Sequence, residues 1–183
     1  MRKSFLSIVV ASAALAALAC TDTAQPIVTT GTMEDSAERT IFGLRTLLTD
    51  RGLMRAELTG DTAYFFDENT RIEIVDVKVT FYASNGAKNA TLTSREGTYN
   101  TRQNRMEARG DVVVVSEDGR RLTSPQLRFD QVRNEISSDS AFTLTEPGRS
   151  VRGIGFVSDP DMNNIRILRL LSGSGGAVDV PER

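Results

Sequence analysis

Alternation of apolar and polar residues dominates the middle of the chain. Val77-x-Val79-x-Phe81 places three apolar side chains on one face of an extended segment, with Lys78 and Thr80 on the other face. The same period of two recurs in Val112-x-Val114, Leu127-x-Phe129 and Phe142-x-Leu144. This period is that of a β-strand with one buried face. No stretch between residues 41 and 167 keeps the 3.6-residue period of a helix, so the pattern predicts an all-β domain.

Turn-forming pairs separate these runs. Asn85-Gly86, Asp118-Gly119 and Pro147-Gly148 fall between successive apolar segments. Glycine and asparagine adopt the positive φ angles that tight hairpin turns require. The sequence therefore predicts antiparallel hairpins.

A repeat organises the predicted strands. Tyr99-Asn100 aligns with Phe129-Asp130 at an offset of 30 residues, and the same offset places Asn104 on Asn134 and Met106 on Ile136. Each unit is an aromatic residue with an acid or amide, a polar turn, a short strand, a small or acidic residue, and a longer strand. A single unit buries its apolar face only by stacking on others. We expect a twisted β-jelly roll, a two-sheet stack of repeated hairpins open at its ends, over residues 41–171.

The start of the chain has the features of an export signal. Arg2 and Lys3 precede an apolar run that ends in Ala19-Cys20, and the run is shorter than a membrane-spanning helix requires. Leu15 to Cys20 resembles a bacterial lipobox, in which the cysteine is acylated; ordinary cleavage before Cys20 is the alternative. We predict a signal peptide over residues 1–19, lipidated Cys20 with a flexible spacer over 20–40, and a disordered Gly/Ser tail over 172–183.

Composition narrows the classes of function. The chain has 22 basic and 24 acidic residues, and cleavage after residue 19 removes two basic residues and no acid. The mature protein is therefore acidic, which does not suit a nucleic-acid binder. The chain has no histidine, no tryptophan and a single cysteine, so the commonest general base and the usual zinc ligands are missing. We expect no catalytic activity, no metal and no cofactor.

Two weaker motifs have simpler interpretations. Asp159 to Asn164 has acidic or amide residues at alternate positions like a calcium loop, but the chain lacks the glycine and glutamate that such loops need at positions 6 and 12. A turn between strands is the better interpretation. Arg120-Arg121 could meet lipid phosphates, although the position after Asp118-Gly119 indicates a solvated hairpin end.

Several short motifs in a fixed order point to a known family. Gly110-Asp111-Val112-x-Val114, then Leu122-x-Ser124-x-x-Leu127-x-Phe129-Asp130, then Gly153-x-Gly155-Phe156 resemble the LptC/LptA (OstA-like) group of lipopolysaccharide-export proteins. The resemblance covers about residues 44 to 168. A single anchor followed by a spacer and one such domain is similar to LptC, with the difference that typical LptC proteins have a transmembrane helix in place of a lipoprotein signal.

The resemblance implies a non-enzymatic bridge that faces the periplasm, with an inner groove that shields the acyl chains of lipid A. It implies edge-strand pairing with the periplasmic domains of an LptF/LptG-type transporter and with an LptA-like protein, and an anchor in the inner membrane; Thr21 after the cysteine leaves the outer membrane open. The inward positions by alternation, as lipid-groove candidates, are Val77, Val79, Phe81, Tyr99, Val112, Val114, Phe129, Phe142, Leu144 and Phe156.

The last apolar segment, Ile165 to Leu171, is predicted to form an exposed edge strand. The candidates for contact with a partner there are Ile165, Ile167 and Leu168. Two other functions stay open: a structural or assembly lipoprotein whose closed β core binds proteins and not lipid, and an envelope hydrolase. Each groove candidate is also an ordinary core residue by type, so the sequence leaves open whether the sheets part to admit lipid.

Overall fold

The computed structural model describes residues 32–174, which form one short helix and nine strands. The signal peptide, Cys20, most of the predicted spacer and residues 175–183 lie outside the described residues. The elements are α1 (Met33–Ser36), β1 (Arg39–Asp50), β2 (Leu53–Phe66), β3 (Arg71–Tyr82), β4 (Lys88–Asn100), β5 (Arg105–Ser116), β6 (Arg121–Asp130), β7 (Glu135–Glu146), β8 (Arg149–Ser158) and β9 (Arg166–Ser174).

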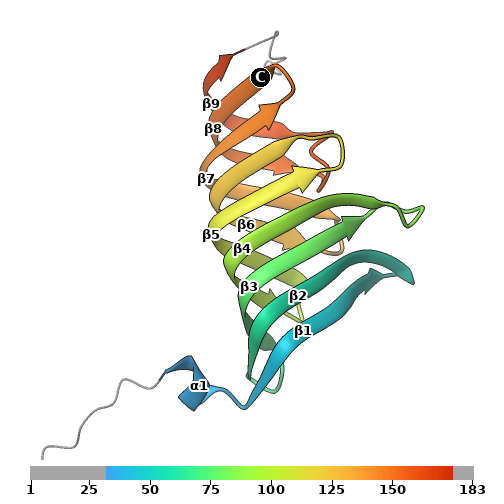
Figure 1. Cartoon of the computed structure of the whole chain (residues 1–183), viewed down its shortest axis with the longest axis vertical. Helices are drawn as coiled ribbons and strands as arrows, with labels where there is room; N and C mark the ends of the chain where they lie inside the picture. Colours follow the sequence, from blue (N-terminus) through green and yellow to red (C-terminus); the bar gives the residue numbers. More distant parts are fainter. Residues whose placement is uncertain (1–31, 175–183) are drawn as a thin grey trace, which may run out of the picture. The chain divides into compact units, whose positions relative to one another are not determined.

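The nine strands form a single antiparallel sheet in chain order, from β1 to β9 (Figure 1). Every strand pairs with the next through a hairpin, and β1 and β9 each have only one partner strand in the part of the chain described. The predicted all-β class and the open ends are confirmed. The three predicted turns are also present, with Gly86, Gly119 and Gly148 at φ of 82°, 88° and 76°.

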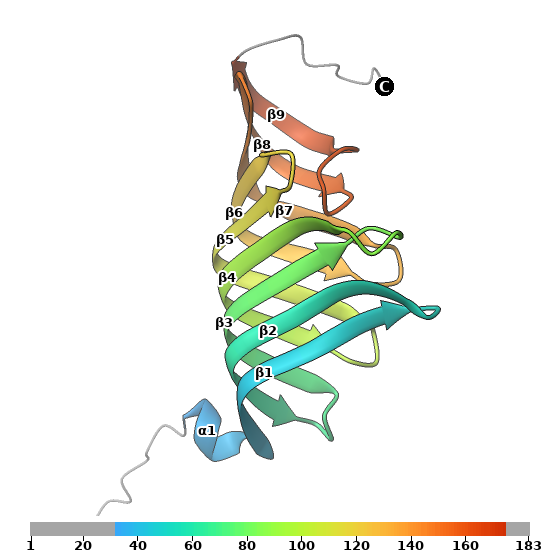
Figure 2. The ribbon, with the colours of Figure 1, turned by 45° about the vertical axis from the view of Figure 1, so that its right-hand side comes forward.

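Each strand bends near its middle, so that its two halves lie in two facing layers joined along the bends (Figure 2). We call the first layer the strand halves that are joined by the hairpins at 51–52, 83–87, 117–120 and 147–148. The second layer consists of the other strand halves, which are joined by the connections at 67–70, 101–104, 131–134 and 159–165. The expected two sheets are therefore two halves of one continuous sheet.

The bends fall where the sequence repeat has its small or acidic residue. In β5 the pairing with β6 stops at Arg109 and resumes at Val112, which leaves Gly110 and Asp111 in a bulge with φ of 74° and 50°. A bulge of this kind bends a strand and strengthens its twist. The short and long strands expected within each repeat are thus one bent strand.

Pro125 lies on the same line of bends, in β6. It lies between Ser124 and Gln126, where the pairing of β6 with both neighbours is interrupted. Proline lacks the N–H that a ladder hydrogen bond needs, so it is tolerated in a strand at such a break. The bend therefore requires no unpaired backbone donor at this position.

The repeat predicted from the sequence corresponds to equivalent positions in the fold. Asn104 and Asn134, aligned at an offset of 30 residues, both lie in second-layer turns with φ of 51° and 53°. Asparagine is among the residues that adopt this left-handed conformation most readily. The polar turn of each repeat is therefore the turn that closes the second layer.

The boundaries of the domain differ slightly from the predicted ones. β1 begins at Arg39, two residues before the expected start, and α1 lies within the predicted spacer. β9 begins at Arg166, so Ile165 precedes the strand, and it continues to Ser174 within the predicted Gly/Ser tail. Among residues 32–174, no helix is long and apolar enough to cross a membrane.

Candidate functional site

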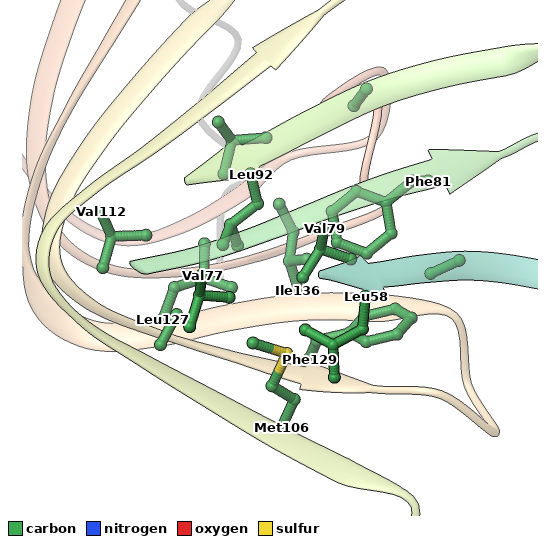
Figure 3. Close-up of a cluster of buried hydrophobic side chains, with 14 of the residues drawn as sticks. Leu58, Val77, Val79, Phe81, Leu92, Met106, Val112, Leu127, Phe129 and Ile136 are labelled. Carbon is green, nitrogen blue, oxygen red and sulfur yellow. The ribbon is translucent and has the colours of Figure 1, made fainter. Parts of the chain in front are cut away.

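The interior between the two layers is the candidate site. All ten groove candidates are buried there, with exposed fractions between 0% and 9%, and they belong to one apolar cluster that runs from β1 to β8. Figure 3 shows side chains from both layers pointing toward one another, among them Val79 and Phe81 from β3 opposite Phe129 from β6. The predicted inward orientation is therefore correct, whereas a role in lipid binding stays a prediction.

Aromatic side chains join the layers at two places. Phe81 in the first layer meets Phe129 in the second edge to face, with ring centroids 4.8 Å apart. Phe142 and Phe156 form a similar pair across the layers, with centroids 5.0 Å apart. Such pairs contribute about 0.5–1.5 kcal/mol beyond the burial of their area. The interior is packed in this conformation, so any guest must replace contacts between the layers.

We call the mouth the side of the interior opposite the bends, where the turns of the two layers face each other. Gln131 links the two layers across this mouth at Thr49 of β1. This residue is 5% exposed and lies in the turn between β6 and β7, in the second layer. Its Nε2 donates to the carbonyl oxygen of Thr49 in the first layer at 2.5 Å, and its Oε1 accepts a hydrogen bond from the Tyr99 hydroxyl at 3.1 Å. Burial raises the pKa of Tyr99, which keeps the hydroxyl protonated and able to donate. The three residues tie the free ends of the two layers together.

The connection between β8 and β9 closes the mouth a second time, near the C-terminal end. Met162 in this connection is 1% exposed and belongs to the apolar cluster. Next to it, the carbonyl oxygen of Asp161 accepts a hydrogen bond from Nη1 of Arg120 in the first-layer turn, at 3.4 Å. The loop therefore reaches from the second layer to the first.

Two carboxyl groups shape this loop. Nδ2 and the backbone N–H of Asn164 donate to Asp159 at 2.6 and 3.2 Å; although burial acts in the opposite direction, these hydrogen bonds hold the pKa of Asp159 below its usual value. Burial, with the charge of Asp159 beside it, raises the pKa of Asp161. In the part of the chain described, no group of three or more acidic, histidine or cysteine side chains could hold a metal ion.

A hollow of about 550 Å³ lies beside the bends, outside most of the predicted groove. Of the ten groove candidates only Val112 and Phe142 line it, and the half-buried outward residues Val113 and Thr143 form part of its wall. The sequence does not predict this hollow, because it arises from the curvature of the sheet across β4 to β9.

Apolar side chains are exposed on both edge strands. Leu168 on β9 is 61% exposed, whereas Ile165 and Ile167 are half-buried and pack against the apolar cluster. Of the three predicted partner-contact residues, Leu168 is the most exposed, and contact with a partner stays a prediction for all three. Sequence reasoning did not identify Phe42 on β1, which is 76% exposed; the apolar residue before Gly43, at the bend of the strand, was the available signal.

The outer face of the second layer is ion-paired. Arg128 contacts Asp139 at 3.1 Å, and Arg105 contacts Asp130 at 3.2 Å. The Arg128 guanidinium holds the pKa of Asp139 below its usual value. Paired charges of this kind suit a surface that stays in water.

Comparison with known proteins points to the family that the sequence motifs resemble. The family described as "Lipopolysaccharide-assembly, LptC-related" matches residues 6–174. No curated protein matches the sequence. Among solved structures, LptH of Pseudomonas aeruginosa, described as the LptA homologous periplasmic component of the lipopolysaccharide transport device, is similar with a TM-score of 0.50 and 14% identity.

The match to LptH covers 62% of this chain and 82% of that one. At this identity the likeness concerns the fold, and it places the bent nine-stranded sheet among LptA-like structures. The family match spans most of the sequence, including all nine strands. The chain therefore belongs to the LptC-related family of lipopolysaccharide-assembly proteins.

Proposed function

We propose that this chain is a non-enzymatic component of lipopolysaccharide export that shields the acyl chains of lipid A between its two layers. The apolar cluster that continues from β1 to β8 is the observation that supports this most directly. Acyl chains and the interior side chains are equally apolar, and each methylene removed from water contributes about 0.8 kcal/mol. Lipid would therefore replace the contacts between the layers at little net cost.

The free edges of β1 and β9 give the proposed bridge its two contacts. An edge strand presents unpaired backbone N–H and C=O groups that a strand of another chain can pair with. We expect one edge to pair with the periplasmic domain of an LptF/LptG-type transporter and the other with an LptA-like protein. Phe42 and Leu168, exposed at these edges, would then be covered by the partners.

The anchor proposed for this bridge is lipid on Cys20, which would hold the domain at the periplasmic face of the inner membrane. The signal-like segment before Cys20 supports this arrangement, because two or three acyl chains give stable attachment to a bilayer. A structural lipoprotein that binds only proteins is the alternative, and the first experiment below distinguishes the two.

Lipid in the interior can be tested by photo-crosslinking. A photoreactive phenylalanine analogue at Phe129, which is 2% exposed, is expected to capture lipopolysaccharide in cells that are exporting it. The matched control is the same analogue at Arg128, the next residue on β6, whose side chain lies on the outer face. Equal labelling at both positions, or protein adducts alone at Phe129, would favour the structural lipoprotein.

Edge pairing can be tested with one charge on each edge strand. Phe42→Asp and Leu168→Asp each place a carboxylate where a partner strand would dock, and we expect each to weaken one of the two partner contacts at least tenfold in a pull-down. Each variant is the control for the other, because both side chains are exposed and neither change disturbs the core. If both variants bind both partners normally, edge pairing is wrong.

The anchor can be tested by replacing its single attachment residue. Cys20→Ala removes the only thiol in the chain, and we expect the protein to be neither acylated nor cleaved at the lipobox. Metabolic labelling with a radioactive or alkynyl fatty acid measures this directly, with the unmutated chain as the reference. Equal incorporation of fatty acid in the two proteins would rule out Cys20 as the lipid site.

A further inference from the structure

The loop between β8 and β9 differs from the other connections of the second layer. It has seven residues, 159–165, whereas the three earlier second-layer turns have four each. Val132, thirty residues before Met162 and in the preceding second-layer turn, is 55% exposed, whereas Met162 is 1% exposed. The longer loop buries Met162 in the interior, and its last residue, Ile165, is half-buried against the same apolar cluster.

Met162 lies where the apolar interior ends. β8 contributes Val151 and Phe156 to the buried cluster, but β9 contributes no buried residue. Beyond Met162 only the half-buried Ile165 and Ile167 pack against the cluster, so without Met162 the interior would be thinly covered beside β9. Methionine is unbranched and flexible, and its side chain fills irregular apolar space much as a short piece of acyl chain does.

Two features of the loop are energetically unfavourable in this closed position. Met162 has φ of 61°, a left-handed conformation that is unfavourable for residues other than glycine, asparagine and aspartate. Oδ1 of Asp161 is buried without a hydrogen-bond partner among the described residues, and burying an unpaired polar atom is unfavourable. These costs are tolerated because the Met162 side chain is removed from water.

The contact between the loop and the first layer is sparse and polar. A hollow of about 140 Å³ separates the two, lined by Asn89, Ser116, Glu117 and Asp118 on one side and by Asp161 and Asn163 on the other. The hydrogen bond from Arg120 to the Asp161 carbonyl, at 3.4 Å, is long. Arg120 also contacts Asp118 and Glu146 at 2.9 and 3.7 Å, so it keeps partners when the loop leaves.

We propose that the loop 159–165 is a plug, in which Met162 holds the C-terminal end of the interior closed until a lipid acyl chain takes its place. The inference rests on the proposed function, since it concerns how the same interior is loaded and opened. Displacement of Met162 frees the end of the interior beside β9, so that an acyl chain can pass to a partner docked on that strand. The free energy gained by burying the acyl chain offsets the free energy lost when the Met162 side chain is exposed to water.

Hydrogen exchange on the full chain measures this displacement. The Met162 amide donates to the Asp159 carbonyl at 3.1 Å, and the Asn164 amide donates to the Asp159 carboxylate. On addition of purified lipid A we expect the protection of both amides to fall at least tenfold. The Thr70 amide, which donates to the Asp67 carbonyl in the second-layer turn between β2 and β3, away from the loop, is the internal control and should not change.

A pair of matched variants adds a second readout. Met162→Ser removes the apolar plug, and we expect capture of lipid A by the photoreactive analogue at Phe129 to rise about fivefold, because a larger fraction of the protein is open. Val132→Ser introduces serine at an exposed apolar position of the preceding second-layer turn and should leave capture unchanged. If Met162→Ser does not fold, the hydrogen-exchange measurement on the unmutated chain decides whether lipid A displaces the loop.

The outcomes separate this inference from the proposed function. Capture of lipid A at Phe129 with unchanged protection of the loop, or equal capture by the two serine variants, would overturn the plug and leave lipid binding in place. Absence of capture in the unmutated chain and in both variants would contradict the proposed function itself.

Discussion

The whole architecture depends on the requirement that each long strand bury one face along both of its halves. A flat strand of 12 residues would present a single apolar face with nothing to cover it, because the one helix within residues 32–174, α1, has only four residues and none of them is buried. Bending every strand at its middle lets the two halves cover each other. The left-handed Asp76 in β3, the bulge at Gly110-Asp111 in β5 and the unpaired Pro125 in β6 are local means by which these strands bend.

The same bend determines where the molecule can open. Along the line of bends the layers are joined covalently by the strands themselves (Figure 2), whereas on the opposite side the contacts found within residues 32–174 are made by side chains. Gln131 bonded to Thr49 closes one part of that side, and the loop that holds Met162 closes another. Parting the layers there would break few hydrogen bonds, so the main cost is the exposure of apolar surface. A lipid that covers this surface removes that cost.

The sequence predicted the fold well because the signals for strands and turns are local. The alternation at Val77 to Phe81 and the Asn85-Gly86 turn depend only on neighbouring residues, and the structure contains both. The alignment of Asn104 with Asn134 also holds, since a repeated turn requires the same backbone conformation each time. The inward orientation of all ten groove candidates follows from the same period of two.

Features that depend on contacts between the layers were not predicted. Nothing near Gln131 in the sequence indicates that it meets Thr49, 82 residues away. Met162 lies in the segment that was interpreted only as a turn between strands, and its burial depends on its contact with the apolar cluster. The half-buried packing of Ile167 against the cluster was likewise not predicted, whereas Leu168 beside it is exposed.

The central claim is that the two layers separate on the side of the hairpins to receive lipid. Pulsed electron paramagnetic resonance between spin labels at the exposed positions Leu53 in the first layer and Val132 in the second layer measures the width of this mouth. The account predicts a longer mean distance when lipid A is added, with no change when a detergent that does not bind is added. An unchanged distance in protein that has captured lipid A would contradict it.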